Sequence, residues 1–172
     1  MAGVEQSTIL WGMMGSGKST LGQGLAEHLG QPFVDTDQLI EKAFGVSCAE
    51  LIASPRKDFG VHQTAAITAH IPTTPEVIAT GGSVAMYPEL VRHLGQFGLG
   101  IFIDVPVGAL ESRLTSERIA AINNPDNLTF GELCRVRAEF YNAAADRRLW
   151  VPGYENEGTT LERLIGLRAT ES

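Results

Sequence analysis

The chain has 172 residues, a net charge of −7 and 44% hydrophobic residues. This length fits a single α/β domain spanning residues 1–172, with enough apolar side chains for a proper core. An acidic surface repels nucleic acid, which argues against a nucleic-acid-binding protein and leaves small anions in a local basic pocket as the ligands to consider.

We expect neither a signal peptide in the N-terminal residues nor a membrane span. The N-terminal residues contain no basic segment followed by a long apolar run, and every apolar run ends well before the ~18 residues of a membrane span. Cys48 and Cys134 lack metal-ligand spacing, so we expect buried free thiols in a reducing cytosol. The sequence thus predicts a cytoplasmic protein with no membrane partner, and we expect a monomer.

Short apolar runs alternate with helical patterns along the chain. Strands are expected at 8–12, 32–37, 76–80, 99–105 and 149–151. Helices are expected at 18–30, 37–45, 47–53, 61–70, 87–95, 106–114, 130–148 and 158–168. Ser47 and Glu50 predict a capping box at the third helix. Residues 115–129 are polar and lack periodicity, which predicts a mobile lid with room for a short helix.

This alternation predicts a three-layer α/β fold in which helices cover both faces of a short parallel sheet of about five strands. Ligands in such folds bind at the carboxyl ends of the strands. The segments GMMGSGKST, DTD and GGS all follow expected strands. We therefore expect them to meet at one edge of the sheet.

Residues 12–20 match the P-loop pattern G-x-x-x-x-G-K-[ST], with a strand before and a helix after, so the fold is expected to be of the P-loop NTPase type. Glycines let consecutive N–H groups point inward, and the helix N-terminus favours an anion. Lys18 is expected to be exposed in the cleft and to reach the β- and γ-phosphates of ATP, while the Ser19 hydroxyl binds Mg²⁺. The predicted cofactor-binding residues are Gly12, Gly15, Ser16, Gly17, Lys18, Ser19 and Thr20.

The rest of the chain narrows the class of nucleotide-binding protein. A GTPase would show a base-reading Asn-Lys-x-Asp run, and the sequence has none. The charge and the small size disfavour an ATPase that acts on DNA. A small-molecule kinase fits one domain with a lid.

Two carboxylates, Asp35 and Asp37, follow the second expected strand. In extended chain, residues i and i+2 face the same way. Beside a P-loop, one carboxylate can hold Mg²⁺ through water, and the other can orient and deprotonate an acceptor hydroxyl. The alternative is that the pair only caps the helix that starts near Asp37.

At this point the chain resembles the shikimate kinases. The resemblance covers nearly the whole length, through GMMGSGKSTLG, FVDTDQLIEKAFGVSCAELI, VIATGGS, Arg118 and RAEFYNAAAD. It implies transfer of the γ-phosphoryl group of ATP to a hydroxyl of shikimate, with Mg²⁺ as cofactor. The catalytic residues it implies are Lys18, Asp37 and Arg118.

The resemblance also implies roles for the other site residues. Asp35 supports Mg²⁺ together with Ser19. Gly81 and Gly82 present backbone N–H groups to the substrate, and Arg137 grips its carboxylate from a helix whose face is expected to point into the cleft. Arg113, at the start of the lid, is expected to stack on adenine. For each arginine the alternative is a solvated charge on a helix face.

The acceptor side departs from the family pattern. The family has a Phe-Arg-x-x-Glu run where this chain has Phe59, Gly60 and Gln63, and a third glycine where it has Ser83; Ile119 replaces a proline after Arg118. Three explanations stay open. In the first, Arg56, Lys57 or His62 replaces the family arginine that is missing at position 60. In the second, the acceptor is a related cyclitol, sugar or gluconate-like sugar acid. In the third, the chain is an inactive nucleotide-binding module. His62 could instead be a surface helix residue.

Overall fold

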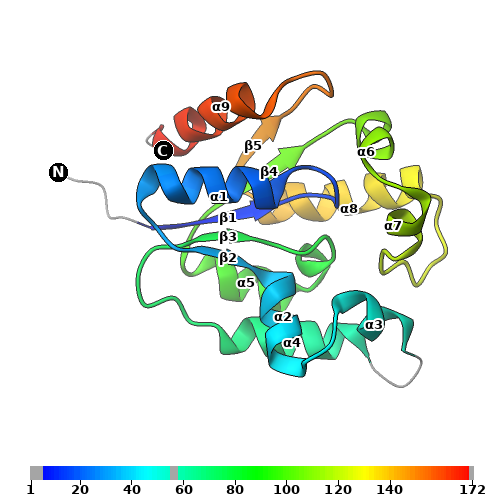
Figure 1. Cartoon of the computed structure of the whole chain (residues 1–172). Helices are drawn as coiled ribbons and strands as arrows, with labels where there is room; N and C mark the ends of the chain where they lie inside the picture. Colours follow the sequence, from blue (N-terminus) through cyan, green and yellow to red (C-terminus); the bar gives the residue numbers. More distant parts are fainter. Residues whose placement is uncertain (1–5, 55–57, 171–172) are drawn as a thin grey trace.

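The structure is a computed structural model that describes residues 6–54 and 58–170. Its described residues contain a five-stranded parallel sheet in the order β2-β3-β1-β4-β5 (Figure 1). The strands are β1 (Ser7–Trp11), β2 (Phe33–Asp35), β3 (Val77–Ala79), β4 (Gly98–Asp104) and β5 (Arg147–Trp150). Both the α/β class and the expected number of strands are confirmed.

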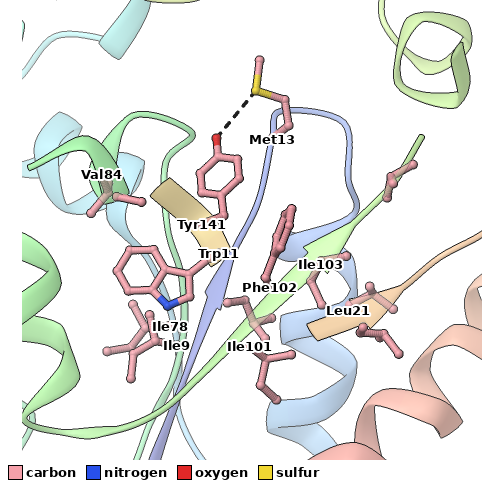
Figure 2. Close-up of a cluster of buried hydrophobic side chains, with 14 of the residues drawn as sticks. Ile9, Trp11, Met13, Leu21, Ile78, Val84, Ile101, Phe102, Ile103 and Tyr141 are labelled. Carbon is pink, nitrogen blue, oxygen red and sulfur yellow. Dashed lines mark hydrogen bonds between the residues drawn. The ribbon is translucent and has the colours of Figure 1, made fainter. Parts of the chain in front are cut away.

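Helices lie on both faces of the sheet. Helices α1 (Lys18–Leu29) and α9 (Glu157–Ala169) pack side by side on one face, and α5 (Pro88–Gly95) and α8 (Phe130–Ala144) contact β4 from the other (Figure 1). Figure 2 shows the core between the sheet and α8, where Trp11, Phe102 and Tyr141 are all buried. Burial on both faces explains why β1 and β4 read as continuous apolar runs.

Three helices form a smaller layer beyond the sheet edge at β2. They are α2 (Thr36–Phe44), α3 (Cys48–Ala53) and α4 (Phe59–Ala69), and they bury Ile40, Leu51, Phe59 and Ala66 as a second apolar cluster. The predicted capping box is confirmed: the Ser47 side chain accepts from the Glu50 N–H, and the Glu50 carboxylate accepts from the Ser47 N–H.

The expected helix over 130–148 is too long at its C-terminal end. Helix α8 stops at Ala144, and Arg147 already pairs with Ile101 in the sheet. The Asp146 carboxylate accepts from the Gly100 N–H at 2.7 Å, and the Asp146 N–H donates to the Gly100 carbonyl. Pairing with β4 therefore ends the helix, through a contact that local propensity does not contain.

Two short helices, α6 (Val107–Arg113) and α7 (Ser116–Ala120), and a 3₁₀ turn, η1 (Val84–Met86), complete the described elements. Helix α7 lies inside the segment expected to be a lid. Cys134 is buried and Cys48 is only half-buried, and both are free thiols. None of the helices in the described part of the chain is both long enough and apolar enough to cross a membrane.

Candidate active site

The loop between β1 and α1 has the backbone shape of a phosphate cradle. Gly15 and Gly17 have φ of +82° and +90°, a region that side-chain-bearing residues rarely adopt. Gly17 is the N-cap of α1 and no side chain caps this helix end. The first N–H groups of α1 are thus left for an anion, which the helix dipole also favours.

Lys18 is buried, so the prediction that it is exposed in the cleft is wrong. Its side chain curls over the loop, and its ammonium donates to the Met13 carbonyl at 2.8 Å and to the Ser16 hydroxyl at 3.4 Å. Burial lowers the pKa of Lys18 from 10.5 to about 8, although the Asp37 and Asp35 carboxylates oppose this effect. The ammonium therefore lies within the loop itself.

The Asp35 carboxylate accepts hydrogen bonds from two groups. Its Oδ1 accepts from the Asp37 N–H at 2.9 Å, which caps α2, and its Oδ2 accepts from the Ser19 hydroxyl at 2.8 Å. The helix-capping alternative is thus correct for one oxygen, while the other lies beside the P-loop serine. A hydroxyl and a carboxylate oxygen in contact are the hard donors that Mg²⁺ prefers.

The Asp37 carboxylate lies against the glycine turn that follows β3. A Cβ on Gly81 would collide with Asp37 Oδ1, so a larger residue at this position would require the Asp37 carboxylate to move. The pKa of Asp37 is raised from 3.8 to about 6, first by burial and then by Asp35, against the opposing effect of Lys18. A carboxylate with such a pKa can accept a proton near neutral pH.

Gly81 does not present a free N–H group. Its amide donates to the Thr36 hydroxyl at 2.8 Å, a contact across 45 residues of sequence. The expectation that Gly81 offers this N–H to a substrate is therefore wrong for this structure. The bond instead fixes the glycine turn to the start of α2, beside Asp37.

A cavity of about 660 Å³ brings most of the predicted residues together. It is lined by residues 15–20 of the P-loop and by Asp35, Asp37, Gly81, Gly82, Arg113 and Arg118. The expected convergence of GMMGSGKST, DTD and GGS on one edge is thus present in the structure. Gly12 and Arg137 do not line this cavity.

The sequence predicts that Arg137 faces the cleft, but in the structure it lies behind the cavity wall. It is 2% exposed, and its Nη1 would lie 3.2 Å from a Cβ built on Gly82. Its Nη2 donates to the Asn123 carbonyl in the segment 115–129. In the described part of the chain, no carboxylate forms an ion pair with it. A buried guanidinium without an anion is costly, which makes this position a candidate anion site.

The other two arginines are exposed on the cavity rim. Arg113, at the end of α6, donates to the Gly15 carbonyl at 3.2 Å. Arg118, on α7, lines the cavity without an ion pair among the residues described. Both are placed where they could contact a nucleotide.

Three parts of the site were not found by reasoning from the sequence. The segment after β5 lines the cavity through Val151, Glu155, Asn156, Glu157 and Thr160, and Thr80 lines it from the end of β3. The signal for both was their position after a parallel strand. Tyr141 was missed as well: its hydroxyl donates to the Gly82 carbonyl at 2.5 Å and lies 3.6 Å from the Met13 sulfur (Figure 2).

The positions that depart from the family pattern lie on α4 and on the glycine turn. The Ser83 hydroxyl donates to Gln63 Oε1 at 2.8 Å. The His62 ring packs edge-on against Phe44 at 4.5 Å, lies 2.7 Å from the Asp58 carbonyl oxygen and borders neither this cavity nor the one beside Gly60. Arg56 and Lys57, the other residues considered as substitutes for a lost cation, lie outside the described residues.

Comparison with known proteins agrees with this geometry. The family model for shikimate kinase matches residues 14–157. A shikimate kinase from Synechococcus elongatus is 36% identical over 91% of this chain and 83% of its own. The crystal structure of a shikimate kinase from Bacteroides thetaiotaomicron is 26% identical, with a TM-score of 0.76 over 94% of this chain and 97% of that one. A shikimate kinase from Acinetobacter baumannii, in complex with shikimate, has the same fold, with 22% identity and a TM-score of 0.79 over 95% of this chain and 93% of its own.

Proposed function

The chain belongs to the shikimate kinase family, and we propose from this premise which of its residues carry out each part of the transfer. It is a phosphotransferase with an alcohol acceptor, and its family implies the use of ATP. We propose that shikimate is the acceptor and that its six-membered ring presents a hydroxyl to Asp37 and a carboxylate to Arg137. The observation that carries this proposal is the buried Arg137 guanidinium beside Gly82, which lacks a carboxylate partner among the described residues.

The nucleotide phosphates are held by the P-loop. Its N–H groups and the N-terminus of α1 bind the phosphate oxygens. The Lys18 ammonium breaks its hydrogen bond to the Met13 carbonyl and moves with the phosphoryl group that is transferred. Arg118 adds a second cation from the lid, and Arg113 lies at the cavity rim where it can reach the nucleotide. These positive charges stabilise a transition state whose charge is spread over the phosphoryl oxygens.

The Ser19 hydroxyl and the Asp35 carboxylate would hold Mg²⁺. Among the described residues no group of three His, Cys, Asp or Glu side chains could hold a metal ion. Two protein oxygens leave the other positions to phosphates and water, which is the usual arrangement for Mg²⁺. When bound there, Mg²⁺ would offset the negative charge of the phosphates.

Asp37 is the proposed base for the acceptor hydroxyl. It lies beside Gly81, within the cavity that also contains the P-loop, and its raised pKa suits proton transfer near neutral pH. Phosphoryl transfer requires the acceptor oxygen in line with the γ-phosphate, so the main task of Asp37 is to orient that oxygen. The presence of Lys18, Asp37 and Arg118 favours turnover over an inactive binding module.

Arg137→Lys tests the assignment of the acceptor. Lysine keeps the charge but loses the planar fork that matches a carboxylate, so KM for shikimate should rise about tenfold or more, with KM for ATP nearly unchanged. Initial rates of ADP formation give both constants. Arg135→Lys, an exposed arginine of the same helix, is the matched control. An equal rise in KM for an analogue with an alcohol in place of the carboxylate would show that Arg137 does not read this group.

Residues 115–129 are the proposed lid. Their backbone is joined to the acceptor side through the bond from Arg137 to the Asn123 carbonyl, while Arg118 borders the phosphate side. Amide hydrogen exchange in this segment should slow when nucleotide and shikimate are both bound, because closure must exclude water from the phosphoryl donor. The buried strand β3 serves as the internal reference. Exchange that stays the same with both ligands would rule out a lid.

A further inference from the structure

The glycine turn connects the acceptor pocket to α4. Gly82 lies against the Arg137 guanidinium, and the next residue, Ser83, donates to Gln63 on α4. Gln63 is fully buried. Gly60 lies three residues before Gln63, and therefore on the same side of that helix. The face of α4 that carries both residues thus borders the surroundings of Arg137.

Tyr87 occupies the space that a side chain at position 60 would need. A Cβ built on Gly60 would lie 2.5 Å from the Tyr87 hydroxyl oxygen and 3.0 Å from two carbons of its ring. Tyr87 is the N-cap residue of α5 and is half-buried. Both residues line a cavity of about 510 Å³ whose rim carries the exposed carboxylates of Asp58 and Glu89.

Three hydrogen-bond donors around this turn lack acceptors. Within residues 6–54 and 58–170, the Tyr87 hydroxyl makes no hydrogen bond, and neither do Gln63 Nε2 and Arg137 Nε, which are both buried. Buried donors without partners are rare and costly, so Gln63 Nε2 and Arg137 Nε indicate a ligand rich in acceptor oxygens, and the half-buried Tyr87 hydroxyl is a further donor beside them. Burial, Asp58 and Glu89 raise the pKa of Tyr87 against the effect of Arg137, so its hydroxyl is protonated and can donate at neutral pH.

We propose that Tyr87 is a specificity-determining residue of the acceptor pocket, with its hydroxyl donating a hydrogen bond to the acceptor carboxylate that Arg137 also binds. This inference rests on the proposed function and deepens it. The Tyr87 hydroxyl takes the place of a cation on α4, and Gly60 is the residue that admits it. Asp58 and Glu89, at the rim of the cavity beside Tyr87, repel a second negative charge there, so the surroundings of Tyr87 fit a monocarboxylate that carries hydroxyl groups.

Tyr87→Phe tests the proposal because it removes the hydroxyl and keeps the ring. KM for shikimate should rise about tenfold or more, since a hydrogen bond to a charged group is lost, while kcat and KM for ATP stay close to those of the unmodified protein. KM for the analogue with an alcohol in place of the carboxylate should change much less. Tyr154→Phe, which alters a tyrosine that is 92% exposed, is the matched control. An unchanged KM for shikimate, or equal rises for both acceptors, would overturn the proposal.

A second variant tests the same contact from the other side. Gly60→Ala places a methyl group against the Tyr87 ring and should also raise KM for shikimate, although alanine favours the helix. The double variant Gly60→Ala with Tyr87→Phe should have a KM for shikimate only slightly higher than that of either single variant, because both changes disturb the same interaction. Full additivity of the two effects would contradict the coupling.

Calorimetric binding of shikimate separates this inference from the proposed function. If the unmodified protein binds shikimate without turnover, the proposed function fails, yet the comparison of its affinity with that of Tyr87→Phe still decides the role of Tyr87. If the unmodified protein does not bind shikimate, both fail.

Discussion

Lys18→Met is expected to lower ATP-dependent turnover by at least about 10²–10³-fold and to leave the protein folded. The ammonium is the one cation inside the P-loop among the described residues, and methionine has a similar length without the charge. Loss of this charge removes stabilisation that the phosphoryl oxygens need in the transition state. Initial rates at saturating ATP and shikimate measure the effect.

The stability of this variant separates a catalytic loss from unfolding. The folded-state pKa of Lys18, about 8, lies below its unfolded value, so the stability it contributes is present above pH 10.5 and is lost as pH falls through 8. At pH 7 the folded protein therefore holds a desolvated charge, and Lys18→Met should melt no lower than the unmodified protein. Lys42→Met, on the exposed side of α2, is the control. Near-normal turnover by Lys18→Met would refute the P-loop assignment.

Local signals explain which parts of the fold could be predicted. The capping box of α3 depends on two residues three apart, and the P-loop depends on a short run between a strand and a helix. Both are present in the structure as expected. Helix α8 was predicted to run too far because its end is set by pairing of Asp146 with Gly100, which lies 46 residues earlier.

The site shows the same division between local and long-range information. The P-loop, the aspartate pair and the glycine turn could be placed in the cavity because each follows a strand of a parallel sheet, whereas Arg113 and Arg118 were expected from the resemblance. The burial and hydrogen bonds of individual groups could not be predicted. Lys18 is buried, the Gly81 N–H donates to the Thr36 hydroxyl, and Arg137 donates to the Asn123 carbonyl. These contacts depend on how distant segments pack, and no spacing in the sequence encodes them.

The departures at Gly60 and Gln63 gain a physical meaning only in three dimensions. In the sequence they are a missing cation and a missing carboxylate. In the structure Tyr87 fills the space beside Gly60, and Ser83 provides a neutral partner for the buried Gln63. A charged pair at these two positions would displace Tyr87 and bury a carboxylate beside a hydroxyl, so its effect depends on residues outside the pair.

Asp37→Asn is expected to lower kcat by roughly 10²–10⁴-fold, with KM for ATP little changed. Asparagine keeps the shape beside Gly81 but cannot take a proton from the acceptor hydroxyl. Asp35→Asn is the matched comparison, because Asp35 contacts Ser19 and should mainly alter the concentration of Mg²⁺ that is needed. A variant at position 37 that loses ATP affinity but turns over normally at saturating ATP would reverse the two roles.

The pH dependence provides an independent check on Asp37. Its pKa of about 6 predicts that kcat/KM for shikimate falls as pH drops through 6, and Asp37→Asn should lack this limb. Because this pKa is raised above the unfolded value of 3.8, the stability that Asp37 contributes is complete below pH 3.8 and is lost as pH rises through 6. Asp37→Asn should therefore raise Tm at pH 8 and leave it nearly unchanged at pH 4. A lower Tm of Asp37→Asn at pH 8 would show that Asp37 has a structural role. A carboxylate that is kept for catalysis at the expense of stability gives a higher Tm when it is replaced.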